Sequence, residues 1–170
     1  MFYQKIKTHD IGNGDGVRLS LYVSGCHLRC AGCFSEETHS FTSGTLYTQE
    51  TEDYIIECLS KPYMSGLSLL GGNPTDNLNE AWLLNLVKRV RKELPHLTIY
   101  CWSGNTFEQL ITDPVAVEFL SYIDMLRDGP YVASKLDLKQ FLQGSTNQGY
   151  VDCKKSLDAG KRINYKFDEL

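Results

Sequence analysis

The chain has 170 residues, 42% of them hydrophobic, which is enough for one buried core and argues against disorder of the whole chain. Its net charge of -4 provides no basic surface for a phosphate backbone and so argues against a nucleic-acid partner. No segment approaches the roughly 20 apolar residues that span a bilayer, and the first residues lack a secretory signal, so we expect a cytoplasmic protein without a membrane partner.

The first half of the chain predicts strands and helices in alternation. Val17 to Val23 is rich in β-forming residues and predicts a strand. Thr48 to Leu59 predicts a helix with Thr48 as its cap. Leu67 to Leu70 predicts a short strand, and the apolar periodicity from Trp82 to Leu94 predicts an amphipathic helix.

The second half continues the alternation and then loses it. Leu97 to Trp102 predicts a strand, and a helix follows from the Asp113-Pro114 start signal to Leu120. Ile123 to Leu126 predicts one more strand. From Gly144 the chain is polar and weakly patterned, so we expect loop or a tail draped on the surface. The prediction is a single domain, 1–170, in which 150–170 is a polar tail.

This order predicts an α/β fold of parallel strands with crossover helices. In such sheets, ligands bind outside the carboxyl ends of the strands. Three loops follow predicted strands: the cysteine-containing loop that begins at Ser24, the Gly71-Gly72 loop and the Ser103-Gly104 turn. We therefore expect these three loops to lie on one rim of the sheet.

The first of these loops contains Cys26, Cys30 and Cys33 in a C-x3-C-x2-C spacing, with Gly25 and Gly32 beside them. A reducing compartment disfavours disulfides, so such a cluster indicates metal or redox chemistry. A fully protein-ligated [4Fe-4S] cubane takes four cysteines, so three leave one iron open to an exogenous ligand.

A structural zinc ion is the alternative to an iron-sulfur cluster, and such an ion requires four protein ligands at a closed site. Candidates for the fourth are Cys58, Cys101, Cys153, His27 and His39. None forms the second C-x2-C pair of a zinc ribbon. Cys58 and Cys101 are expected in the core, and His27 is expected to face solvent.

The cysteine spacing resembles that of the radical S-adenosylmethionine superfamily. Within this superfamily, the sequence from about Gly12 to Gln148 resembles the activating proteins of anaerobic ribonucleoside-triphosphate reductase. The motifs that carry this resemblance are Asn13-Gly14-Asp15-Gly16-Val17-Arg18, Ser24-Gly25-Cys26, Cys30-Ala31-Gly32-Cys33-Phe34, Gly71-Gly72-Asn73-Pro74, Trp102-Ser103-Gly104, Asp128-Gly129 and Gly144-Ser145-Thr146-Asn147-Gln148. It implies an open partial (βα) barrel.

The resemblance also assigns a cofactor site. Cys26, Cys30 and Cys33 would hold the cluster and act as the catalytic centre. Gly71 and Gly72 would hold the amino group of S-adenosyl-L-methionine. The main chain of Gly32, Cys33 and Phe34 would line its adenosyl part, and Ser103 would reach its ribose or methionyl end, or else only cap a turn. Asn73 stands where the family usually has an acidic residue, so we expect weaker binding of the ammonium.

The implied function is radical generation on another protein. The cluster would receive an electron from an external low-potential donor of flavodoxin or ferredoxin type and cleave S-adenosylmethionine reductively. The resulting 5'-deoxyadenosyl radical would produce a glycyl radical on the large subunit of the reductase. The alternatives are activation of another glycyl-radical enzyme, small-molecule chemistry as in a deazaguanine synthase, or a non-catalytic zinc-binding module.

Overall fold

The protein is described by a computed structural model that covers residues 1–137, 139, 142 and 144–167. These residues form a mixed α/β fold with one seven-stranded sheet of order β3-β1-β2-β4-β5-β6-β7. The strands are β1 (Phe2–Asp10), β2 (Val17–Val23), β3 (Thr45–Leu46), β4 (Met64–Gly71), β5 (Thr98–Trp102), β6 (Met125–Asp128) and β7 (Gly149–Asp152). The α-helices are α1 (Gln49–Leu59), α2 (Trp82–Glu93), α3 (Phe107–Leu110), α4 (Pro114–Leu120) and α5 (Cys153–Ala159), with 3-10 helices η1 (Glu36–Thr38), η2 (Pro74–Asn77) and η3 (Ala133–Lys135). No helix in this part of the chain is long and apolar enough to cross a bilayer.

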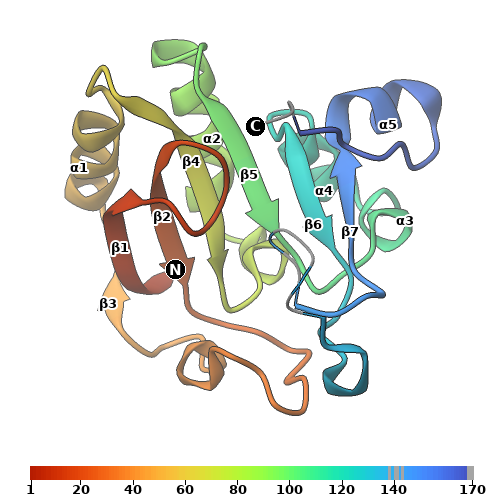
Figure 1. Ribbon diagram of the computed structural model, residues 1–170. Helices are drawn as coiled ribbons and strands as arrows, with labels where there is room; N and C mark the ends of the chain where they lie inside the picture. The colour runs from red at the N-terminus through yellow and green to blue at the C-terminus, as the bar shows by residue number, and fades with distance from the viewer. Residues whose placement is uncertain (138, 140–141, 143, 168–170) are drawn as a thin grey trace.

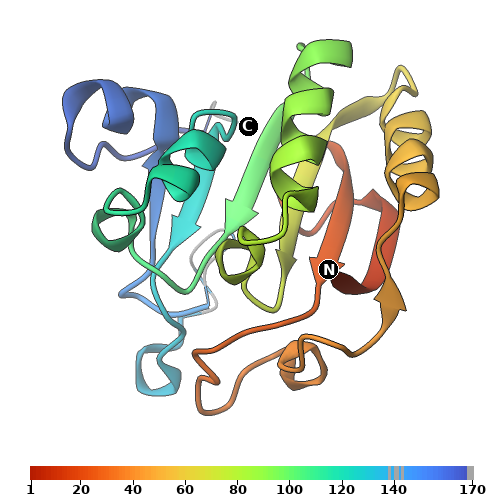
Figure 2. The same cartoon turned by 180° about the vertical axis from the view of Figure 1, so that it is seen from behind.

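The four central strands confirm the predicted parallel arrangement. β2, β4, β5 and β6 are parallel and follow one another in sequence order. Each right-handed crossover places the next strand on the same side of the preceding strand. The helices of these connections must therefore all lie on one face of the sheet. Figures 1 and 2 show this: α1, α2 and α4 cover one face, and the opposite face is free of them. The outer strands pair antiparallel with their neighbours, β1 with β2 and β3 on one side and β7 with β6 on the other, which the sequence did not predict.

The two faces of the sheet differ in chemistry. Successive side chains of a strand point to opposite faces. On the helix-covered face, buried apolar side chains form the core; its strand residues include Leu19, Leu21, Leu67, Leu69, Ile99, Cys101 and Leu126. The buried polar side chains alternate with these apolar residues along the strands and therefore lie on the helix-free face. They are Arg18, Ser20, Ser68, Tyr100 and Arg127. The helix-free face is thus a polar interior surface, suited to a ligand rather than to a core.

Arg18 ties three central strands together on this polar face. Its Nε donates to Ser68 Oγ (2.8 Å), and its Nη1 donates to Thr98 Oγ1 (2.8 Å). Its Nη2 donates to the carbonyls of Leu67 and Thr98, both at 3.0 Å. The guanidinium also lies 3.8 Å from the centre of the Tyr100 ring. Arg18 therefore has a structural role at the amino end of β2, away from the cysteine loop.

The prediction of loop or tail from Gly144 onward is wrong for residues 149–159. β7 pairs with β6 in an antiparallel register that joins Leu126 to Val151. Asp152 then caps α5 by accepting from the amide of Lys155 (3.0 Å), and Cys153 is fully buried. The strand depends on a neighbour distant in sequence, so its own composition does not reveal it. The last three residues of the predicted tail, 168–170, lie outside the described residues.

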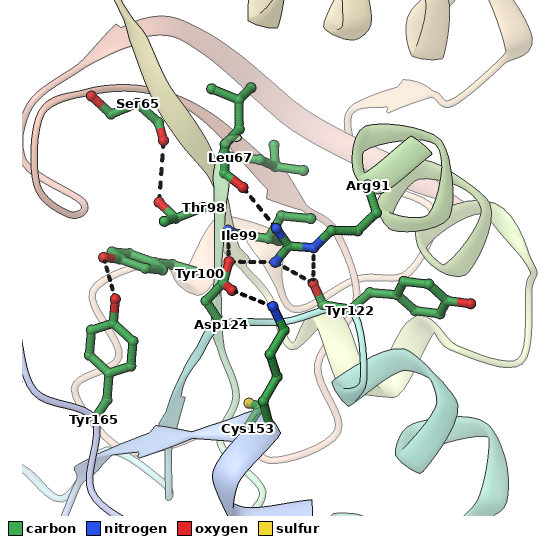
Figure 3. A network of polar contacts seen from close by, with 12 residues as sticks. Ser65, Leu67, Arg91, Thr98, Ile99, Tyr100, Tyr122, Asp124, Cys153 and Tyr165 are labelled. Atoms are coloured by element: carbon green, nitrogen blue, oxygen red, sulfur yellow. Dashed lines mark hydrogen bonds and ion pairs between the residues drawn. The ribbon is translucent and has the colours of Figure 1, made fainter. Parts of the chain in front are cut away.

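Arg91, a basic residue of α2, makes internal contacts. Figure 3 shows Arg91 reaching Asp124, with which it forms an ion pair, and the carbonyl of Tyr122, to which its Nη2 donates at 2.7 Å. Asp124 also accepts from the amide of Ile99 at 2.7 Å. The aspartate is thereby fixed just before β6, which begins at Met125, two residues after the predicted start at Ile123.

Candidate functional site

A cleft of about 860 Å³ opens at the carboxyl ends of the four parallel strands. It is lined by eight of the nine predicted site residues, namely Cys26, Cys30, Cys33, Phe34, Gly71, Gly72, Asn73 and Ser103. Gly32 is not among the described residues that line it. The prediction that the three loops share one rim is confirmed. The roles of the individual residues in cofactor binding remain predictions.

The cysteine loop leaves β2 through a fixed backbone junction. The amide of Gly25 donates to the carbonyl of Thr38 (2.7 Å), and the amide of Cys26 donates to that of His39 (3.2 Å). A turn then closes between Cys33 and Cys30, the amide of the former donating to the carbonyl of the latter at 3.1 Å. The segment around η1 thus holds both the entry and the exit of the loop that carries the three thiols.

The three thiols are free and partly exposed. The pKa of the Cys33 thiol is raised, first by burial and further by the neighbouring charges of Cys30 and Cys26, although a hydrogen bond from the Ser35 amide opposes the shift. The thiols are thus near enough to repel one another as thiolates. Positively charged iron removes that repulsion.

The donor set fits a cluster better than a single ion. Within the described residues, no three His, Cys, Asp or Glu side chains are arranged to hold one metal ion. A cubane instead takes each thiolate on a different iron and needs the sulfurs spread around it. The three thiols of this loop supply one ligand for each of three irons, and the rest of the cleft is left for a further ligand.

The Gly71-Gly72 loop is packed directly against the cysteine loop. The amide of Gly72 donates to the carbonyl of Val23, and the amide of Asn73 donates to the carbonyl of Gly25, both at 2.8 Å. A Cβ at position 72 would stand 2.4 Å from the Gly25 carbonyl oxygen. Only glycine allows the two backbones to approach so closely.

Asp76, which is not among the predicted site residues, also joins these two loops. Its Oδ2 accepts from the amide of His27 (2.8 Å) and lies 3.2 Å from His27 Nδ1. The imidazole itself is 75% exposed, so the expectation that it faces solvent is confirmed. Asp76 follows Gly71-Gly72-Asn73-Pro74 in the chain, but only the folded loop brings it to His27.

The Asn73 side chain is buried within a polar network. Its Oδ1 accepts from Thr75 Oγ1 (3.0 Å) and from the amide of Gly104 (3.3 Å), and its Nδ2 donates to Asn105 Oδ1 (2.7 Å). Thr75 Oγ1 lies 2.7 Å from Ser103 Oγ. The network therefore joins the loop after β4 to the turn after β5, and it occupies both lone pairs of the amide oxygen.

The comparisons with known proteins agree with this geometry. A family model described as "4Fe-4S single cluster domain" matches residues 12–151. A protein of Vibrio cholerae is 41% identical over 150 residues, which cover 87% of this chain and 96% of the relative. Relatives from enterobacteria phage T4 and Escherichia coli K12 are 37% and 35% identical over 87% of this chain and 92% and 96% of their own lengths. All three are named anaerobic ribonucleoside-triphosphate reductase-activating protein.

Fold, cysteine loop and matched model together define a protein of the single-cluster [4Fe-4S] class. Within that class, the chain belongs to the family of anaerobic ribonucleoside-triphosphate reductase-activating proteins.

Proposed function

We propose that this chain activates an anaerobic ribonucleoside-triphosphate reductase by generating a glycyl radical on its large subunit. The observation that carries the proposal is the cleft in which three free thiols face a glycine-rich strand end. The names of the relatives, which cover 87% of the chain, support the choice of the reductase as the partner.

In this proposal, Cys26, Cys30 and Cys33 hold the [4Fe-4S] cluster, and S-adenosylmethionine occupies the rest of the cleft. When bound and reduced, the cluster supplies the electron that splits the sulfonium into methionine and a 5'-deoxyadenosyl radical. The chain's own residues bind and orient. Gly71 and Gly72 present backbone carbonyls to the amino group, the main chain of Gly32, Cys33 and Phe34 borders the adenosyl part, and Ser103 reaches the ribose or methionyl end.

The sheet supports the proposed architecture of an open partial (βα) barrel. Its parallel strands follow in sequence order with helices on one face, and its polar face bears the cleft. Exposed apolar side chains, Ile11 (78% exposed) and Phe34 (70%), stand at the cleft. We place the large subunit of the reductase over them, where it would exclude water from the radical.

The proposal includes a cytoplasmic location and an external low-potential electron donor of flavodoxin or ferredoxin type. Anaerobic reconstitution with iron and sulfide, reduction, and addition of S-adenosylmethionine test the chemistry: we expect about four irons per chain and release of 5'-deoxyadenosine. Addition of the reductase large subunit should then give a glycyl radical by electron paramagnetic resonance.

The same experiment distinguishes the proposed function from the alternative functions. Release of 5'-deoxyadenosine without a radical on the reductase would direct the search to another glycyl-radical enzyme or a small-molecule substrate. One tetrahedral zinc per chain and no 5'-deoxyadenosine would refute the proposal.

Asn73→Asp is expected to tighten the binding of S-adenosylmethionine by about tenfold, the effect of one stronger charged hydrogen bond. Both lone pairs of the present amide oxygen are used by Thr75 and Gly104. A carboxylate would keep those contacts and add a second oxygen for the ammonium, while Asn105 turns its amide to donate. Calorimetric titration of the reconstituted proteins measures the change. Equal or weaker binding by a variant with unchanged thermal stability would remove Asn73 from the amino-group site.

A further inference from the structure

Arg127 is a buried cation on the polar face of the sheet, near the carboxyl end of β6. It is 1% exposed and lines the cleft that contains the three cysteines. Its Nε donates to the carbonyl of Leu142 (3.1 Å), and its Nη1 donates to that of Gly149 (3.0 Å). These two bonds fix the guanidinium plane. Its Nη2 is buried and has no hydrogen-bond partner among the described residues.

A charged donor without a hydrogen-bond acceptor destabilises a folded protein when it is buried in the interior. A buried N–H left unpaired costs about 1–3 kcal/mol, and more when the group is charged. Asp128, next in the chain, directs its Oδ2 to Arg162 Nη1 (2.8 Å) and to the amide of Phe107 (3.0 Å). The Tyr150 ring, 5.3 Å from the guanidinium carbon, makes a cation–π contact with it. No described residue therefore accepts from Nη2, and the position of Arg127 at the cleft favours a ligand as the acceptor.

Arg18 provides the internal comparison. It is also fully buried on the polar face, yet each of its three donor nitrogens has an acceptor within 3.0 Å. Arg18 does not line the cleft, and Arg127 does. The buried arginine with an unused donor is thus the one beside the ligand space, as expected if a ligand supplies the missing acceptor.

The charges around the cleft point to an anionic acceptor. Of the described residues that line it, none is Asp or Glu, whereas Arg127 and Lys139 are cations. Burial lowers the pKa of Arg127 to about 10, so its guanidinium is still charged at neutral pH. A planar guanidinium matches a carboxylate better than a lysine ammonium does.

We propose that Arg127 binds the carboxylate of the small molecule held in the cleft, donating from Nη2 to one carboxylate oxygen. This inference rests on the proposed function, which makes that molecule S-adenosylmethionine, whose only carboxylate belongs to its methionine part. A carboxylate has two oxygens, so one can coordinate iron while the other accepts from Arg127. Arg127 is then a specificity-determining residue for ligands that carry this group.

The test compares two ligands on three proteins. S-Adenosylmethionine and its decarboxylated analogue are titrated calorimetrically, without oxygen, into reconstituted wild type, Arg127→Met and Arg127→Lys. We expect Arg127→Met to weaken S-adenosylmethionine binding about 10- to 100-fold, the effect of one charge-assisted hydrogen bond, and to leave the analogue unchanged. Arg127→Lys should show a smaller loss because it keeps the charge without the fork.

Equal losses for both ligands, or no loss for either, would overturn the proposal. Weaker association with the reductase alone would instead assign the acceptor to a carboxylate of the partner, and that result also overturns it. Should Arg127→Met not fold, the ligand difference in Arg127→Lys decides. Failure of wild type to bind S-adenosylmethionine at all would refute the proposed function, and so the two failures are distinguishable.

Discussion

Replacement of any one of Cys26, Cys30 or Cys33 by alanine is expected to abolish release of 5'-deoxyadenosine, with a loss of at least about 1,000-fold. Each thiolate is one of only three protein ligands to the proposed cluster, so its loss leaves two irons without a protein ligand instead of one. Such a cluster should be lost on gel filtration. Iron and sulfide analysis of the reconstituted variants, together with their visible absorption, measures this directly.

Cys58→Ala is the matched control because Cys58 is a partly buried thiol of α1 outside the cleft. It should retain iron and activity as wild type does. Unfolding of the cysteine variants should change little, since the entry of the loop is held by backbone bonds to Thr38 and His39 that need no thiol. Full iron content in Cys26→Ala, Cys30→Ala and Cys33→Ala would show that other residues hold the metal.

Local sequence signals were sufficient for the parallel half of the fold. The strand Val17–Val23 has the predicted bounds, and α4 begins with the predicted Asp113 cap and Pro114. The apolar face of α2 could be predicted because apolar residues recur along it at helical spacing, and the following are all buried in the structure: Leu83, Leu86, Val87 and Val90. In each case, the residues that define the element are neighbours in the chain.

The antiparallel strands β1 and β7 were missed for a different reason. In β1, most residues are only partly buried and polar residues outnumber apolar ones, so the segment lacks the apolar run that predicts a buried strand. β7 is four residues long and forms by pairing with β6. Edge strands gain their stability from the neighbour to which they bond. For β7 that neighbour is distant in the sequence, whereas β1 pairs with β2, the next strand of the chain.

The same distinction applies to the site. Cysteine spacing and the glycine pair were sufficient to predict which loops meet. Asp76, Asn105 and Arg127 were not predicted, because their roles arise from contacts across 49, 32 and 15 residues, respectively. A signal for Arg127 was present: a charged residue inside an apolar strand, directly before Asp128-Gly129. From the sequence alone, Arg127 would be interpreted as a solvent-exposed residue at the end of a strand.

Gly72→Ala is expected to lower the affinity for S-adenosylmethionine, and the rate of its cleavage, by about 100-fold, the cost of a misplacement of about 1 Å at a reacting centre. The added methyl would stand 2.4 Å from the carbonyl oxygen of Gly25 and 3.0 Å from that of Thr38. Both obstacles are backbone atoms, so no side chain can rotate away. The loop after β4 must therefore move away from the cysteine loop.

Gly12→Ala is the matched control, since Gly12 also lines the cleft but its added methyl would meet only Asp10 Oδ1, at an ordinary 3.5 Å. Calorimetric titration and single-turnover formation of 5'-deoxyadenosine, each at equal iron content, compare the two variants. Normal binding in Gly72→Ala would mean that the spacing between the two loops does not position the ligand. A large defect in Gly12→Ala would mean that any added methyl in the cleft is harmful. The proposed site requires the first variant to fail and the second to function, because Gly72, unlike Gly12, lies directly against the backbone of the loop that holds the thiols.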